Sequence, residues 1–316
     1  MSTIQEKSEI IFLYESKYSM PNGDPFTGEQ RYDEETKKVL VSDVRIKRFI
    51  RDYLHDANKT IYVINTKEQA EEGTTGSGSA ARVQALRKLY EEELKAAEKE
   101  AKDNKDKSFN PNLFVLKKCI DVRLFGGIST EKKGNVNLTG PVQFALLNPS
   151  LNSVDLRMHQ NTSVFSSDVS KSGGAIGTTT LVPYSLNQIH GWINPFTAKL
   201  SGLKDDDVKI MFKALWESIN NVNTRSKSNQ SSLLLLQLVY ENKTDKVYGT
   251  DKLISYTSEK RDEQFRDVTD LEFNFEALKK VISSDKIKQV KYYTESKDIK
   301  EKLSSISDKL KKLNLY

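Results

Sequence analysis

Three short runs of apolar residues predict strands that are buried on both faces. They are SEIIFLYES (8–16), TIYVINT (60–66) and SSLLLLQLVYE (231–241), and each is bounded by polar or turn-forming residues. Short apolar runs between such boundaries are typical of strands inside a sheet. We expect the first and the last run to be central strands of one sheet.

In residues 43–54 the apolar residues recur with the period of a helix. Their apolar positions follow the i, i+3, i+4, i+7, i+8 spacing of an amphipathic helix, with Ser42 or Asp43 available as N-cap. A second amphipathic helix is predicted for DDDVKIMFKALWESI (205–219), just before the last apolar strand. The apolar face of the first helix consists of Ile46, Phe49, Ile50, Tyr53 and Leu54.

The composition changes between residues 71 and 110, which indicates an insertion. A Gly/Ser-rich stretch precedes a charged helix with one thin apolar stripe through Val83, Leu86, Tyr90 and Leu94. Apolar periodicity returns at 111–127. NVNLTGPVQFALLNP (135–149) then predicts a strand that lies at an edge or bends, because it contains Gly140 and Pro141.

Residues 150–182 are rich in Ser, Thr, Asn and Gly, which predicts a long hairpin or protruding arm with few core contacts. LVPYSLNQIHGWINP (181–195) reads as mixed strand and loop. The order β, α, β, inserted helices, β, arm, β, α, β is typical of an α+β, ferredoxin-like sandwich interrupted by insertions.

Positive charge is concentrated at 37–51. The chain has 49 Lys and Arg against 44 Asp and Glu, a net charge of only +5, but this stretch holds six basic residues and one acidic residue. On a helical wheel Lys47, Arg48 and Arg51 form one surface with Arg45 at its flank. Cations near a helix N-terminus oppose the helix dipole by ~0.3–1 kcal/mol each. A phosphate partner would remove that conflict, whereas the alternative is a solvated helix face.

Two further segments could bind a ligand. TRSKSNQ (224–230) places Arg225, Ser226 and Lys227 before an apolar strand, where they could contact phosphates or form a soluble loop. MPNGDP (20–25) could hold a metal through Asp24 or present backbone amides, but a simple turn is the favoured reading.

Several classes of protein and site are excluded. No stretch has the ~18 consecutive apolar residues of a membrane span, and the N-terminus has no signal-peptide pattern, so we expect a cytoplasmic protein without membrane contact. One cysteine, Cys119, and three scattered histidines predict no disulfide, no metal site and no cofactor.

Five blocks in order resemble one known family. They are MPNGDP (20–25), SDVRIKRFIRDYL (42–54), IDVRLFGG (120–127), TGPVQFAL (139–146) and NTRSKS (223–228). Together they resemble the guide-RNA-binding backbone subunit of type I CRISPR surveillance complexes (Cascade), a family of the RAMP superfamily, and subtype I-B in particular. The resemblance covers about three quarters of the chain, and each block alone would be weak.

The resemblance implies a modified RNA-recognition (RRM-like) fold with three parts. Residues 1–66, 136–149 and 183–316 would form the palm, 67–135 an inserted helical fingers region and 150–182 a thumb hairpin. It implies RNA contacts on all three parts. The residues are Asn22, Ser42, Arg45, Lys47, Arg48 and Arg51 at the guide backbone, Phe125 and Gly126 on the fingers side, and Val164 or Phe165 as a thumb wedge between bases.

The implied function is non-catalytic. Copies of the chain would polymerise head to tail along the guide (CRISPR) RNA, beside other Cascade subunits, and present it for pairing with target DNA. Two alternatives stay open. One is a metal-dependent RNA endonuclease, because relatives in type III complexes cut target RNA with an acidic residue in the loop after the first strand, and Asp24 or Asp33 could occupy such a position. The other is a general single-stranded nucleic-acid-binding protein outside CRISPR.

Overall fold

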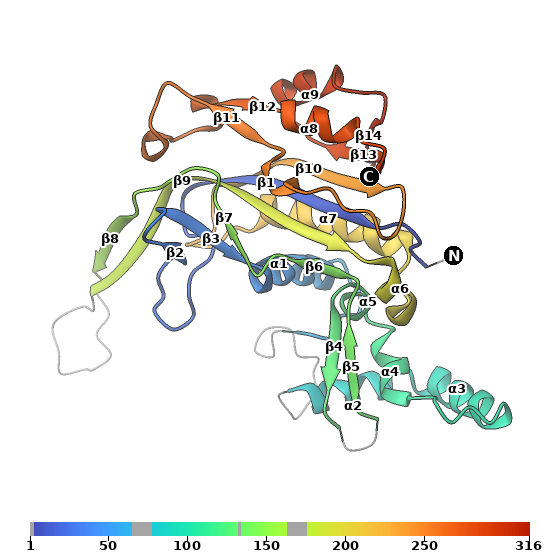
Figure 1. The fold of residues 1–316 in the computed structure, drawn as a ribbon. Helices are drawn as coiled ribbons and strands as arrows, with labels where there is room; N and C mark the ends of the chain where they lie inside the picture. Colours follow the sequence, from blue (N-terminus) through green and yellow to red (C-terminus); the bar gives the residue numbers. More distant parts are fainter. Residues whose placement is uncertain (1–2, 65–77, 132–133, 163–175) are drawn as a thin grey trace, which may run out of the picture.

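The computed structural model describes residues 3–64, 78–131, 134–162 and 176–316, built around one seven-stranded sheet (Figure 1). Its order is β14-β13-β10-β1-β9-β6, with β8 paired to β9. The strands are β1 (Ser8–Ser19), β6 (Val142–Phe144), β8 (Arg157–Thr162), β9 (Ile176–Ile193), β10 (Gln230–Tyr240), β13 (Ile287–Tyr293) and β14 (Leu310–Lys312). The two strands predicted to be central are confirmed, because β1 lies antiparallel between β10 and β9, and β10 lies between β1 and β13.

Helices α1 (Asp43–Asp56) and α7 (Asp205–Asn221) cover one face of this sheet, as Figure 1 shows. Both predicted helices are confirmed, and Ser42 is the N-cap of α1. Alternate residues of β1 point to this face, where the ring of Phe12 meets Trp216 of α7 at 6.3 Å between centroids. Burial of these apolar faces fixes both helices on the sheet.

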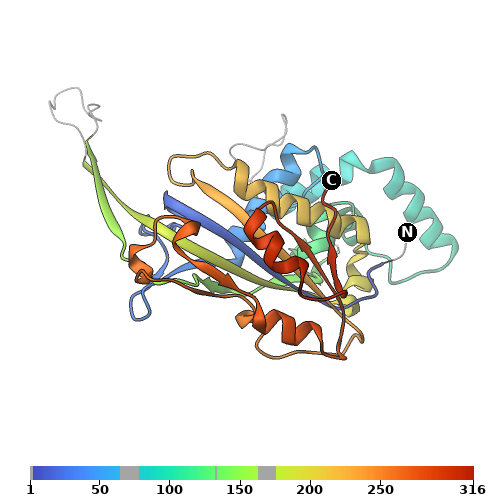
Figure 2. The same cartoon turned by 90° about the horizontal axis from the view of Figure 1, so that it is seen from above.

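The C-terminal region covers the opposite face, against the other set of β1 residues (Figure 2). There Ile11 and Leu13 of β1 share an apolar cluster with Phe265 and Leu278. The elements of this region are the 3-10 helices η1 (Thr250–Lys252), η2 (Asp262–Gln264) and η3 (Val268–Asp270), the strands β11 (Ser255–Thr257) and β12 (Glu272–Asn274), and the helices α8 (Glu276–Ile282) and α9 (Lys297–Ser304).

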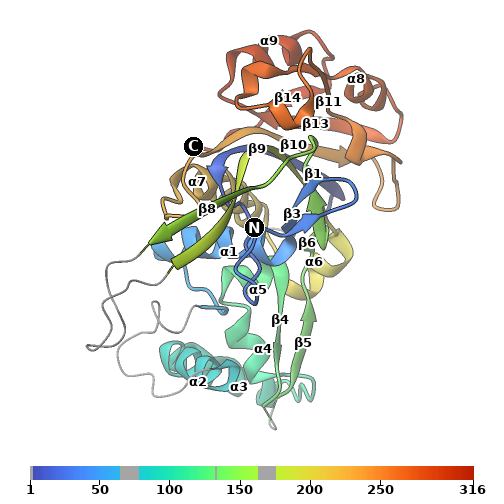
Figure 3. The ribbon, with the colours of Figure 1, turned by 90° about the vertical axis from the view of Figure 1, so that its left-hand side faces the viewer.

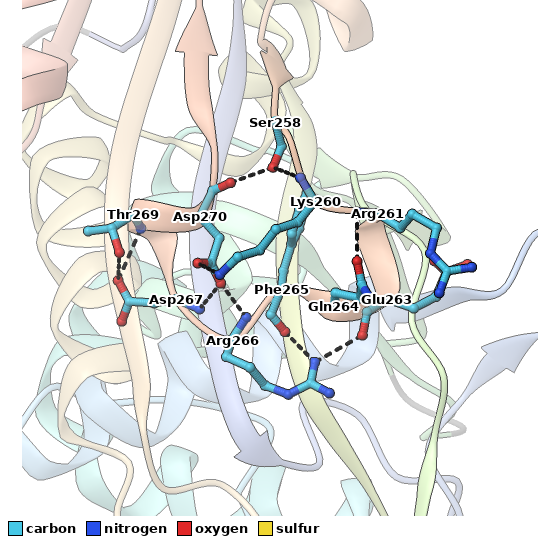
Figure 4. A network of polar contacts seen from close by, with 10 residues as sticks. All are labelled: Ser258, Lys260, Arg261, Glu263, Gln264, Phe265, Arg266, Asp267, Thr269 and Asp270. Carbon is cyan, nitrogen blue, oxygen red and sulfur yellow. Dashed lines mark hydrogen bonds and ion pairs between the residues drawn. The ribbon is translucent and has the colours of Figure 1, made fainter.

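A compact polar network holds the turn between β11 and β12 in shape (Figure 4). The Asp270 carboxylate accepts hydrogen bonds from the Arg266 and Asp267 backbone N–H groups and pairs with Lys260. From this turn Asp267 reaches Lys17 of β1 at 2.5 Å, and that contact lowers the pKa of the Asp267 carboxyl to about 2. The network therefore attaches the C-terminal region to the central strand.

The insertion extends from the sheet on the side of α1 (Figures 1 and 3). It comprises α2 (Ser79–Leu89), α3 (Glu91–Asp103), α4 (Pro111–Leu116), α5 (Ile120–Phe125), β4 (Gly126–Ser129) and β5 (Val136–Thr139). Val83, Leu86 and Leu94 are buried in a separate apolar cluster, as their stripe predicted. The predicted single charged helix is instead two helices, which meet at Tyr90.

Two strand predictions are wrong. Residues 60–64 form no strand, and 65–66 lie outside the described residues. The reason is that the N–H groups of Tyr62 and Val63 donate to the Asp121 carboxylate, so a side chain takes the place of a neighbouring strand. Conversely, 181–193 is uninterrupted strand within β9, because twelve-residue β1 pairs along it.

The predicted hairpin consists of β8 and the first part of β9, which project beyond the sheet in all three ribbon views (Figures 1, 2 and 3). It begins only at Arg157, since Ser150, Asn152 and Val154 are buried against the body of the protein. Val164 and Phe165 lie outside the described residues. The remaining elements are β2 (Tyr32–Asp33), β3 (Lys38–Ser42), β7 (Leu147–Pro149) and α6 (Pro195–Ser201).

The bend predicted at Gly140 and Pro141 is confirmed, because the chain leaves β5 there and enters β6, the edge strand of the large sheet. β5 itself pairs with β4 of the insertion. In the part of the chain that the structure describes, no helix is long and apolar enough to cross a membrane.

Gly126 is the tightest point of the insertion, and we predict that Gly126→Ala destabilises the protein. Its φ and ψ of 84° and −176° suit only glycine, and an added Cβ would lie 2.1 Å from the Leu138 carbonyl oxygen. We expect a loss of about 3 kcal/mol in the free energy of unfolding. The control is Gly202→Ala, which also has positive φ but open space around it and should cost only about 1–2 kcal/mol. Equal effects in urea denaturation would contradict the argument.

Candidate nucleic-acid interface

Three segments that are distant in sequence meet at one end of β1. The Lys17 N–H donates to the Asn229 carbonyl at 3.0 Å, and the Met20 N–H donates to the Ser226 carbonyl at 2.6 Å. These bonds hold the loop after α7 against the end of β1. The side-chain oxygen of Asn22 in turn accepts from the Ser42 N–H at 2.7 Å, which adds the start of α1. The 20–25 loop, helix α1 and the 223–229 loop therefore form one continuous surface.

Asn22 and Ser42 fix this junction from within. Asn22 is buried, and its backbone N–H donates to the side chain of Gln30. The Ser42 hydroxyl donates to Asn22 and accepts from the Arg45 N–H, so it caps α1 and holds the loop at once. The two residues position the surface, since their polar atoms are occupied by the protein itself.

Arg45 has a partly buried charge without an ion pair among the described residues. Its guanidinium lies over the Phe49 ring at 3.7 Å, and no hydrogen bond or ion pair joins it to another described residue. Burial lowers the pKa of this group to about 10. The neighbouring Tyr14 hydroxyl is also buried without a partner among the described residues, and burial raises its pKa. Buried polar groups are normally paired, so the partly buried Arg45 guanidinium would gain from an anionic partner.

Lys227 adds a second cation to the same place. Burial lowers the pKa of its ammonium group, and the charge of Arg45 lowers it further. The ammonium donates to the Ser226 hydroxyl at 3.3 Å. Arg225 lies exposed beside it. A partly buried cation whose protonation is disfavoured by a neighbouring cation is stabilised by an anion that contacts both groups. The unpaired cation cluster, as we call Arg45 and Lys227, is thus suited to a phosphate group.

The other basic residues of α1 are paired within the protein. Lys47 contacts Asp43 and Gln143, Arg48 contacts Asp52, and only 13% of the Lys47 side chain is exposed. Lys47, Arg48 and Arg51 therefore do not form an unpaired positive surface, and their contacts with RNA stay a prediction. Helical periodicity shows which residues leave the core, but it cannot show which neighbouring elements supply partners.

Arg51 belongs to a buried anchor around Asp121, a residue that the sequence did not single out. The fully buried Asp121 carboxylate pairs with Arg51 at 3.0 Å and accepts the Tyr62 and Val63 N–H groups. It therefore joins α1, residues 61–63 and α5. An aspartate at the second position of a short helix gives no sequence signal for such a role.

Phe125 and Gly126 also act inside the protein. The Phe125 ring is buried against Phe144 and lies 5.3 Å from the Arg51 guanidinium. Gly126 allows β4 and β5 to approach closely. The structure thus places both residues in the joint between the insertion and α1.

The two candidate catalytic carboxylates are already occupied. Asp24 accepts the Phe26 N–H at 2.9 Å, which lowers the pKa of its carboxyl, and pairs with Arg31. Asp33 accepts the Thr36 hydroxyl, which lowers its pKa in the same way. Within the described ranges, no three His, Cys, Asp or Glu side chains are grouped to hold a metal ion.

We predict that Asp121→Asn loosens the insertion and lowers the free energy of unfolding by about 3 kcal/mol. The substitution leaves the Arg51 charge without its counterion and replaces one of the two oxygens that accept the Tyr62 and Val63 N–H groups with an NH₂ donor. The matched control is Glu91→Gln, which breaks the exposed pair with Lys95 and should change stability very little. Chemical denaturation measures both. An Asp121→Asn variant as stable as the control would show that Asp121 is not an anchor.

Comparison with known proteins agrees with this architecture. The family model of CRISPR-associated protein Cas7 matches residues 6–276. CRISPR-associated protein Cas7 of Haloferax volcanii is 27% identical over 290 residues, which cover 85% of this chain and 80% of that protein. A chain of a CRISPR RNA-guided surveillance complex in a pre-nicking state has a TM-score of 0.55 at 14% identity, over 98% of this chain and 96% of that one.

A chain of a second CRISPR RNA-guided surveillance complex has a TM-score of 0.51 at 12% identity, over 98% of this chain and 95% of that chain. These two solved structures share the fold along nearly the entire chain. The family match covers most of the sequence and includes β1, α1, the insertion, β9 and β10. The protein therefore belongs to the Cas7 family of CRISPR-associated proteins.

Proposed function

We propose that this protein is the guide-RNA-binding backbone subunit of an RNA-guided surveillance complex. The unpaired cation cluster is the observation that supports this function most strongly, because Arg45 and Lys227 are partly buried charges without a protein counterion among the described residues. A phosphate of single-stranded RNA would supply that counterion. Membership of the Cas7 family supports a guide RNA as the source of this phosphate.

The proposed contacts are independent of sequence. Phosphate contacts fix the position of a strand without reading its bases, so the guide can carry any sequence and base pairing selects the target DNA. Further copies of the chain would bind head to tail along the guide, which requires two different surfaces that meet. Other subunits would complete this cytoplasmic complex.

The proposed parts follow the layers of the structure. The order β10-β1-β9-β6, with α1 and α7 on one face, supports a ferredoxin-like, RRM-like palm. The separate apolar cluster of the insertion supports a fingers region, which we extend to residue 139 because β5 pairs with β4. We assign the thumb to the paired segments 157–162 and 176–181, which project beyond the sheet.

The direct test is the double variant Arg45→Gln/Lys227→Gln. We expect weaker binding to guide RNA of any sequence and a log–log salt slope reduced by about 1.4, that is about 0.7 for each lost phosphate contact. The control Lys279→Gln/Lys280→Gln removes the same charge from exposed positions of α8, on the opposite face of the sheet. Filter binding at several salt concentrations measures the slopes. Equal salt slopes of RNA binding for the two double variants would show that this cluster does not contact the RNA.

The rival function is metal-dependent cleavage of RNA. Because the Asp24 and Asp33 carboxylates are held by hydrogen bonds in their own turns, we expect no cleavage of guide or paired RNA with Mg²⁺ or Mn²⁺. Gel analysis of labelled RNA measures this. Cleavage that Asp24→Asn or Asp33→Asn abolishes would make the protein a nuclease.

A further inference from the structure

Tyr18 combines an unfavourable backbone with an exposed aromatic ring. Its φ is 46°, in the left-handed region, and its side chain lies in the solvent, with 59% of the residue exposed. Large side chains rarely adopt this conformation, which costs free energy that glycine or asparagine would largely avoid. Exposure means that burial of the ring in the core does not compensate for this cost.

The sheet is built to turn this residue outward. In a regular strand Ser16 and Tyr18 would share a face, but the hydroxyls of Ser16 and Ser19 meet at 2.5 Å instead. In the register of β1 and β9, Lys17 pairs with Tyr184 and Ser19 pairs with Val182. Pro183 therefore lies across from Tyr18. Since proline has no N–H, one ladder bond is missing at the point where the strand is distorted. The distortion puts Ser19 beside Ser16 and moves Tyr18 out of that face.

The position of Tyr18 is next to the unpaired cation cluster. Its two flanking backbone contacts, from Lys17 to Asn229 and from Met20 to Ser226, are made to the loop that carries Lys227. Asn229, on that loop, also has a positive φ, of 54°. The strained backbone of Tyr18 therefore lies at the joint with the loop that carries Lys227. Backbone strain of this kind is concentrated at functional sites.

We propose that Tyr18 is a stacking platform for one unpaired base of the bound RNA, whose phosphate lies at Arg45 and Lys227. This rests on the proposed function. A ring beside a basic groove binds single strands through the base face, and every base offers such a face, so the contact tolerates any guide sequence. The site would thus take a nucleotide at two points, the phosphate at the cations and the base at the ring.

The test pairs a change in the protein with a change in the RNA. Binding of the full-length chain is measured for a mixed-sequence single-stranded RNA and for an oligomer of the same length whose nucleotides are abasic. Stacking on one ring predicts that Tyr18→Leu weakens binding of the first about 5- to 100-fold and leaves binding of the abasic strand nearly unchanged. Tyr18→Phe should bind like the wild type. The control Tyr248→Leu alters an even more exposed tyrosine in the C-terminal region and should have no effect.

Tyr18→Gly separates binding from stability. It relieves the backbone strain, so its denaturation midpoint should not fall below that of the wild type, yet it should bind base-containing RNA as weakly as Tyr18→Leu. If both Tyr18 variants bind RNA normally while Arg45→Gln/Lys227→Gln binds RNA more weakly, Tyr18 is not a base platform and the proposed function stands. If all three variants bind RNA normally, both the base platform and the proposed function are rejected. A Tyr18→Leu variant that binds a short RNA normally but assembles fewer copies on a long one would make Tyr18 a subunit contact, which also overturns the proposal.

Discussion

The structure depends on β1 being buried on both faces and paired on both edges. It pairs antiparallel with β9 on one side and β10 on the other. Because successive side chains point to opposite faces, one set builds the core under α1 and α7, and the other builds the core under the C-terminal region. A shift of β1 by one residue would exchange the two sets, so both layers fix its register.

The candidate interface follows from the end of this strand. β1 emerges from the sheet beside the start of α1 and the loop before β10, and hydrogen bonds from Lys17, Met20 and Asn22 hold the three segments together. The rigid sheet thereby positions loops that carry the polar groups, which is the usual division between scaffold and site.

Charge pairing divides the basic residues of α1 into two groups. Lys47, Arg48 and Arg51 have acidic partners, and the Arg51 pair with Asp121 also joins the insertion to α1. Arg45 lacks such a partner among the described residues and lies near Lys227 instead. A paired cation contributes to the fold, whereas a desolvated cation without a counterion increases the affinity for an anion.

The sequence by itself determined the elements whose residues carry the information locally. The apolar runs of β1 and β10, the period of α1 and the composition of the insertion each predicted the correct element, because burial on one or two faces leaves a regular pattern. The five blocks also indicated the family.

Tertiary structure decided what depends on a distant partner. The sequence of residues 60–64 predicted a strand, but the Tyr62 and Val63 N–H groups donate to Asp121 instead of to a neighbouring strand. The helical wheel placed Arg45 at the edge of the basic surface and could not show that its guanidinium lacks a partner among the described residues. The reason is physical: periodicity reports which side of an element is buried, but pairing energies depend on neighbours that only the folded chain brings together.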